Sequence, residues 1–227
     1  MNIADLWAEI EEEQTWRLDE IRFFQNQIDN FASNDDKNKY RKALILLLYA
    51  HFEGFCKFAF SHYIKAINSE NITCGEANYA ITATSLSDIF QELRNPDKKN
   101  TEFRNALPDD AKLHRFARDR EFVEKSNGFN AKTLEIPDDA VDMESNLKPI
   151  VLRKNLYKLG FPHDKFSSLE GQINKLLNFR NNIAHGNKVI GIENNEYEKL
   201  RDDVNFIISE IKREIMFALQ NGEYLRP

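Results

Sequence analysis

The sequence has little glycine and proline, with eight glycines and six prolines among 227 residues. A fold of many short strands and tight turns uses more of both, so this scarcity favours helices. Cysteine is scarcer still: Cys56 and Cys74 are too far apart to form the CxxC pair of a zinc or redox site. We expect both to be buried free thiols in a reducing compartment, which indicates a cytoplasmic protein.

Several motifs that mark catalytic or nucleotide-binding sites are absent. The sequence contains no HExxH, paired HxH, GxGxxG, GxxxxGK[ST] or GxSxG. Their absence removes support for zinc chemistry, for a glycine loop that holds phosphates, and for a serine nucleophile elbow. We therefore expect no metal and no cofactor. By elimination, any catalysis would be metal-independent and would depend on histidine and arginine.

Strong positive charge is also missing, because the net charge is −6. This argues against strong non-specific attraction to nucleic acid, although a local basic patch could still exist. Residues 1–13 are acidic and lack the basic and apolar regions of a signal peptide. The stretch from Ala43 to Phe60 is apolar but contains His51, Glu53 and Lys57, so we expect a buried core helix and no membrane span.

Apolar residues at three- and four-residue steps predict an all-α bundle. Helices are expected over residues 3–31, 38–67, 85–94, 148–159, 168–185 and 197–219. Ser33 to Asp36 supply capping residues for the second helix. We predict a single domain over residues 1–227, with a core at 1–95 and 146–227. Residues 96–145 are mostly polar and form an insertion with short helical pieces.

Arg180 interrupts the apolar face of the 168–185 helix. On an ideal helix Leu169, Ile173, Leu176 and Ala184 fall within about 40° of Arg180. A buried guanidinium is costly unless it meets an anion, either a protein carboxylate or a ligand phosphate. His185 follows five residues later and Gly186 ends the helix. The pair is therefore a candidate site, although both residues would also stabilise a plain helix C-terminus.

Other residues could complete this site. Asn181 shares a helical face with His185 and could orient the imidazole. Arg180 and His185 point about 140° apart on an ideal helix, so a second copy of the chain could complete the site. Glu53 needs a cation, which is either Lys57 one turn away or Arg180. His51 lies about 160° round the same helix from Glu53, so both cannot face one cleft of a single protomer.

The segment from Lys112 to Arg120 is the best candidate for RNA contact. It carries Lys112, Arg115, Arg118 and Arg120 with Phe116 between them, so bases could stack while cations meet phosphate. Asp119, Glu121 and Glu124 dilute its charge, and a solvated helix face explains the same pattern.

Two segments resemble signatures of a known family. Arg180 to His185 resembles the arginine–histidine motif of the HEPN superfamily of all-α domains, in which a polar residue usually follows the arginine. Tyr49-Ala50-His51-Phe52-Glu53-Gly54, followed by Lys57, is similar to a signature of the RiboL-PSP-HEPN group, whose aromatic residue is often tryptophan instead of Phe52. The resemblance covers residues 38–67 and 168–220.

The resemblance implies a homodimeric, metal-independent endoribonuclease with a composite cleft at the dimer interface. Arg180 would hold the scissile phosphate, His185 would act as general acid or base, and Asn181 would orient His185 or contact phosphate. Glu53 would aim Arg180, with His51 and Lys57 as further supporting candidates. Such domains often act as toxins or antiphage effectors, so a cognate antitoxin or defence-system protein is an expected partner.

Two other functions fit the same residues. A non-catalytic HEPN-like module would use Arg180 and Glu53 to bind a nucleotide or a protein, and would leave His185 as a helix-end residue. A plain helical interaction protein would use its apolar stripes as oligomer interfaces. The intact arginine–histidine motif favours the enzyme, because a binding role needs no imidazole beside the arginine.

Overall fold

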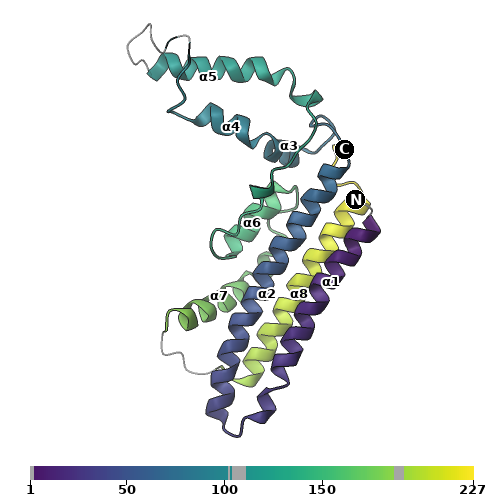
Figure 1. Ribbon diagram of the computed structural model, residues 1–227, viewed down its shortest axis with the longest axis vertical. Helices are drawn as coiled ribbons and strands as arrows, with labels where there is room; N and C mark the ends of the chain where they lie inside the picture. Colours follow the sequence, from purple (N-terminus) through teal and green to yellow (C-terminus); the bar gives the residue numbers. More distant parts are fainter. Residues whose placement is uncertain (1–2, 102, 104–110, 187–191) are drawn as a thin grey trace.

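The computed structural model describes residues 3–101, 103, 111–186 and 192–227. This part of the chain is all-α, as predicted, and its β-structure is limited to isolated bridges. Figure 1 shows the arrangement. The α-helices are α1 (Ile3–Gln25), α2 (Asn34–Ser69), α3 (Tyr79–Ser85), α4 (Ser87–Arg94), α5 (Ala111–Ser126), α6 (Pro149–Lys158), α7 (Glu170–Ala184) and α8 (Asn194–Gln220).

The core of the molecule is a bundle of the three long helices α1, α2 and α8 (Figure 1). Helix α2 is central because it packs against α1, α7 and α8. Its side chains Phe52, Phe55, Phe60 and Tyr63 are buried. Large aromatic side chains bury more apolar surface than any other residues, so this part of α2 contributes strongly to the stability of the bundle.

Helix α2 begins as the sequence predicts. The Ser33 hydroxyl accepts a hydrogen bond of 3.1 Å from the backbone N–H of Asp36, which satisfies an amide that the first helical turn leaves unpaired. By length and composition alone α2 could cross a membrane, but 56% of its most apolar window is buried inside the molecule. Because α1, α7 and α8 cover it, we interpret α2 as the core helix of a soluble helical domain.

Helices α3, α4 and α5 form an arm that projects from the end of α2 (Figure 1). The base of the arm is closed by backbone pairing. The Cys74 N–H donates to Lys132 O at 2.8 Å and the Leu134 N–H donates to Ile72 O at 2.8 Å. The Asn68 side chain makes two hydrogen bonds of 2.9 Å with the backbone of Ile136. The chain therefore returns to α2 immediately after the arm.

The arm differs in detail from the predicted insertion. Helices α3 and α4, which precede residue 96, stand with α5 outside the three-helix bundle (Figure 1). After the arm, Leu134, Ile136, Val141 and Met143 are buried in the core. The second half of residues 96–145 therefore packs against the bundle, and the division into core and insertion stays a prediction.

Candidate functional site

Helix α7 carries the arginine–histidine motif and packs against α2. Ile173, Leu176 and Leu177 are buried and fix the helix against the core. His185 is the C-cap residue, and Gly186 follows with a φ of 70°. Such a left-handed backbone favours glycine because a side chain there is strained. The helix therefore ends at the histidine, as predicted.

Arg180 is half-buried on the inner side of α7, next to Tyr49 of α2. Its guanidinium carbon lies 5.3 Å from the centroid of the Tyr49 ring, which is within the range of a cation–π contact. Its Nη1 also donates a hydrogen bond of 2.9 Å to Oδ1 of Asn181. The Asn181 amide oxygen is thus engaged with Arg180, whereas we expected Asn181 to orient the imidazole of His185 or to contact phosphate.

In the part of the chain that the structure describes, Glu53 forms no ion pair with Arg180, the cation that the sequence suggested for it. Its Oε2 accepts a hydrogen bond of 2.5 Å from the Tyr49 hydroxyl and one of 2.9 Å from the Leu147 N–H. The Leu147 N–H also lies 2.8 Å from the Tyr49 oxygen. Tyr49 lies one turn before Glu53 and contacts the carboxylate through its hydroxyl and the guanidinium through its ring.

The Tyr49 hydroxyl is held in its protonated, donating form. Burial raises the pKa of Tyr49, and the hydrogen bond to the Glu53 carboxylate raises this pKa further. The Leu147 N–H and the charge of Arg180 act in the opposite direction. The carboxylate thus fixes the phenol ring by a charge-assisted hydrogen bond, and the ring supports the arginine.

His51 faces the opposite side of α2, toward α1, and is only 5% exposed. Its Nδ1 lies 3.1 Å from Nη1 of Arg17, and its Nε2 lies 2.8 Å from the Glu20 carboxylate. Since Arg17 can only donate, Nδ1 accepts and Nε2 carries the proton. Burial and the charge of Arg17 lower the pKa of His51, against the opposing effect of Glu20 and Glu13. His51 therefore belongs to the α1–α2 interface and not to the Arg180 cluster.

Gly54 belongs to the same α1–α2 interface. A Cβ at this position would lie 3.0 Å from both terminal nitrogens of Arg17. Such a separation is closer than side chains normally tolerate, so the glycine leaves room for the guanidinium against α2. The signature string on α2 thus divides by helical face: Tyr49 and Glu53 support Arg180, whereas His51 and Gly54 receive Arg17.

The remaining predicted residues lie elsewhere. Lys57 is exposed on α2 and, in the described part of the chain, forms no ion pair with Glu53. On α5, Arg118 donates to the carbonyl oxygens of Leu93 at 3.3 Å and Lys98 at 3.0 Å. Arg120 pairs with Glu124 at 2.8 Å. Lys112 and Arg115 are exposed, and their contact with RNA stays a prediction.

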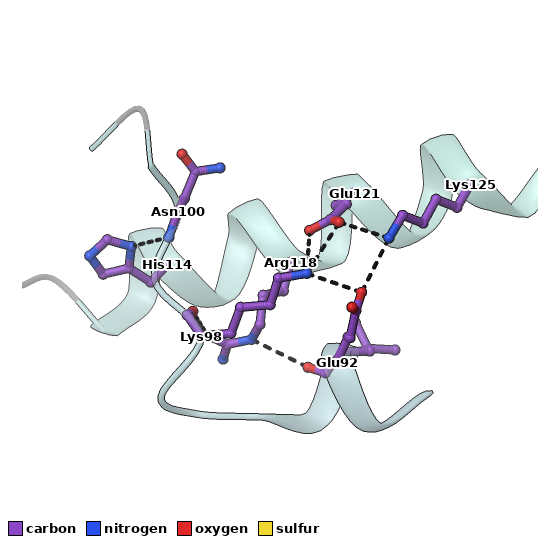
Figure 2. Close-up of polar contacts among 8 residues, drawn as sticks. Glu92, Lys98, Asn100, His114, Arg118, Glu121 and Lys125 are labelled. Atoms are coloured by element: carbon purple, nitrogen blue, oxygen red, sulfur yellow. Dashed lines mark hydrogen bonds and ion pairs between the residues drawn. The ribbon is translucent and has the colours of Figure 1, made fainter. Parts of the chain in front are cut away.

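Figure 2 shows what the charged residues of the arm do. Lys98 and Lys125 each bridge the carboxylates of Glu92 and Glu121, at distances of 2.9 to 3.2 Å. Arg118 lies beside this network, so its guanidinium ties α5 to α4. The cluster stabilises the arm and neutralises its own charge.

His185 is exposed at the end of α7. Among the described residues its imidazole takes part in no hydrogen bond or ion pair. Arg180 points inward to Tyr49, while the histidine is open to solvent. The two side chains of one protomer therefore point in different directions, in line with their separation around an ideal helix.

Two groups of this cluster, the Tyr49 ring and the Leu147 N–H, were not predicted from the sequence. Tyr49 was visible in the signature string, but only as part of a pattern, and the residue is buried. Leu147 contributes only its backbone N–H, to residues more than 90 positions earlier. No side-chain pattern could have identified it.

The geometry describes an all-α domain with an arginine–histidine helix end supported by a tyrosine–glutamate pair on a central helix. The family model of RiboL-PSP-HEPN matches residues 12–216. The chain therefore belongs to the RiboL-PSP-HEPN family, and its bundle is a HEPN-superfamily domain. Membership supports a HEPN-type, ribonuclease-related function. No curated protein and no solved structure matches the chain.

Proposed function

We propose that this protein is a metal-independent endoribonuclease of HEPN type. The observation that carries the proposal is how Arg180 is positioned. Its guanidinium contacts the Tyr49 ring and the Asn181 side chain, and the same helix end presents the exposed imidazole of His185. A fixed guanidinium suits a phosphate, and imidazole gains and loses a proton near neutral pH.

The proposed reaction uses the nucleophile that RNA itself carries. The 2′-oxygen attacks the adjacent phosphorus, a P–O2′ bond forms, and the P–O5′ bond breaks. His185 accepts the 2′-OH proton, and a protonated imidazole or water returns a proton to the 5′-oxygen. Arg180 stabilises the charge on the phosphoryl oxygens. The products are a 2′,3′-cyclic phosphate and a 5′-OH. Because RNA supplies the nucleophile, the reaction does not require a metal.

We propose that the site is completed by a second copy of the chain. Arg180 points inward and His185 is exposed, so one protomer does not bring them onto one surface. The outer face of α7 has a groove of about 300 Å³, lined by Asn174, Lys175, Asn178 and Phe179 among others. Gly171 and the short side chains of Asn174, Asn178 and Asn182 on this face allow close approach of a second helix. Light scattering at working concentrations tests this, and a strict monomer counts against the composite site.

The proposed biological role is that of a toxin or antiphage effector in the cytoplasm. Cys56 and Cys74 are both buried free thiols, which fits a reducing compartment. A cognate antitoxin or defence-system protein would then control the activity.

A cleavage assay in EDTA tests the enzymatic proposal. Total RNA is incubated with the wild type, with Arg180→Ala and with His185→Ala. The matched control is Arg22→Ala, which removes an exposed arginine outside the site. We expect cleavage by the wild type and this control only. Cleavage by His185→Ala at the wild-type rate overturns the mechanism. If no form cleaves and Arg180→Ala alone loses nucleotide binding, the non-catalytic binding module is correct.

A further inference from the structure

A groove of about 780 Å³ lies between the arm and α6, away from Arg180. Helices α3 and α4 form one wall, and α6 with residues 137–140 forms the other. Figure 1 shows α6 beside this end of the arm. Its lining includes Tyr79, Phe90, Arg94, Asp139, Tyr157 and Lys158.

Two tyrosines present their rings at this groove. Tyr79 on α3 is 76% exposed and Tyr157 on α6 is 68% exposed. Arg226 lies over the Tyr79 ring, with its guanidinium carbon 4.7 Å from the centroid, and His163 meets Tyr157 edge-on at 6.0 Å. These contacts restrain both rings without burying them. Restrained, exposed aromatic rings are suitable surfaces for flat ligands.

The groove is also more basic than the chain as a whole. Arg94 and Lys158 line it, with Asp139 as the acidic residue among its lining residues. The Arg94 guanidinium carbon lies 5.6 Å from the centroid of the Phe90 ring. Within the described chain Arg94 forms no ion pair, unlike the paired cations on α5. A positive charge here is therefore available in a molecule whose net charge is −6.

We propose that this groove binds single-stranded RNA, whose bases stack on Tyr79 and Tyr157 while Arg94 and Lys158 contact its phosphates. Exposed aromatic rings combined with cations are the arrangement by which proteins hold single strands without reading their sequence. The inference rests on the proposed ribonuclease function and adds a substrate-binding site to it.

Helix α6 connects this groove with the residues that hold Arg180. Leu147, two residues before α6, donates its N–H to Tyr49 and Glu53. Tyr157 and Lys158 are the last residues of α6. At the rise of an α-helix, ten residues span about 15 Å, so a strand of a few nucleotides can follow α6 from the groove toward the catalytic arginine.

Binding is measured by fluorescence anisotropy with the full-length protein and a labelled 2′-O-methyl oligouridylate. This probe lacks the free 2′-OH, so it binds without being cleaved, and its result is independent of catalysis. The variants are Tyr79→Leu, Tyr157→Leu, Tyr157→Phe and Arg94→Glu. Arg22→Glu on α1 is the control, since this residue is exposed and lies outside the groove, and Phe116→Leu tests the competing basic segment on α5. Circular dichroism checks that every variant is folded.

We expect each tyrosine-to-leucine change to weaken binding roughly tenfold or more, and Tyr157→Phe to retain affinity because it keeps the aromatic face. Arg94→Glu should reduce the slope of log affinity against log salt by about 0.7 for each phosphate that the variant no longer neutralises. Undiminished binding by the leucine variants overturns the proposal, and weaker binding by Phe116→Leu instead places RNA on α5. A wild type that cleaves RNA yet does not bind this probe also overturns the groove while leaving the ribonuclease intact. Binding that depends on the tyrosines without any cleavage refutes the ribonuclease alone.

Discussion

The guanidinium carbon of Arg180 lies 5.3 Å from the centroid of the Tyr49 ring, and the hydroxyl of that ring donates to Glu53. The carboxylate therefore influences the arginine through the phenol and not by direct contact. An aromatic face holds a cation without neutralising it, whereas an ion pair would satisfy the guanidinium and compete with a phosphate. This arrangement keeps Arg180 positioned and still able to bind an anion.

Two substitutions of Tyr49 separate its ring from its hydroxyl. Tyr49→Phe removes the hydrogen bond to Glu53 but keeps the ring, so we expect a decrease of about 1 kcal/mol in unfolding free energy and nearly unchanged cleavage. Tyr49→Leu removes the cation–π contact, and the cleavage rate should fall roughly two- to thirtyfold. Denaturant unfolding and initial cleavage rates measure both effects. Equal rates for the two variants would show that the ring does not support Arg180.

His51 should make stability depend on pH. The pKa of His51 is lowered from its ordinary value of 6.5, so the unfolded chain binds more protons than the folded chain between the two values. The contribution of His51 to the free energy of unfolding is fully present above pH 6.5 and is lost as the pH falls through this window. The wild type should lose up to about 1.4 kcal/mol per pH unit relative to His51→Gln. Urea unfolding of both proteins from pH 7.5 to 5 measures the difference, and parallel curves would disprove it.

Gly54 and Arg17 should be energetically coupled. In the wild type, Gly54→Ala should disturb the guanidinium of Arg17, because the new Cβ would lie 3.0 Å from its terminal nitrogens. In an Arg17→Ala background that obstacle is gone. The same change should then stabilise the protein by about 0.5–1 kcal/mol, since alanine is the better helix former. A double-mutant cycle measures the coupling, and additive effects would mean that the glycine is not there for Arg17.

Arg118 should matter for the arm and not for the bundle. It donates to the carbonyl oxygens of Leu93 in α4 and of Lys98 in the segment after α4. These hydrogen bonds join that part of the arm to α5. We expect Arg118→Ala to increase amide hydrogen exchange in α5 while α2 and α8 remain protected. Arg115→Ala, at an exposed position on the same helix, is the matched control and should change neither. Equal exchange in the two variants would remove the structural role of Arg118.

The sequence was sufficient for most of the fold because the long helices are amphipathic. Helices α6, α7 and α8 begin and end within a few residues of their predicted bounds, and the predicted cap at Ser33 is present. Helix α3 was not predicted. Its seven residues are too few for a clear apolar period, and its first turn is capped by the Asn78 side chain. Short helices of this kind depend on tertiary contacts that periodicity does not reveal.

The candidate site was predicted in its residue types but not in its contacts. Opposite charges suggested that Glu53 would pair with Arg180, but Glu53 accepts a hydrogen bond from the Tyr49 hydroxyl and Arg180 contacts the Tyr49 ring. Angular reasoning did separate His51 from Glu53, because helical geometry fixes the faces of one helix. It could not name Arg17 as the partner of His51, since that contact depends on how α1 packs against α2.

The most direct test of the proposed reaction is the chemistry of the RNA ends. One single-stranded RNA and its 2′-O-methyl counterpart are incubated with the wild type in EDTA, and the product ends are mapped. We expect that only the unmodified RNA is cut, leaving 2′,3′-cyclic phosphate and 5′-OH ends. Cleavage of the methylated strand, or products with 5′-phosphate ends, would contradict attack by the 2′-oxygen and with it the roles of Arg180 and His185.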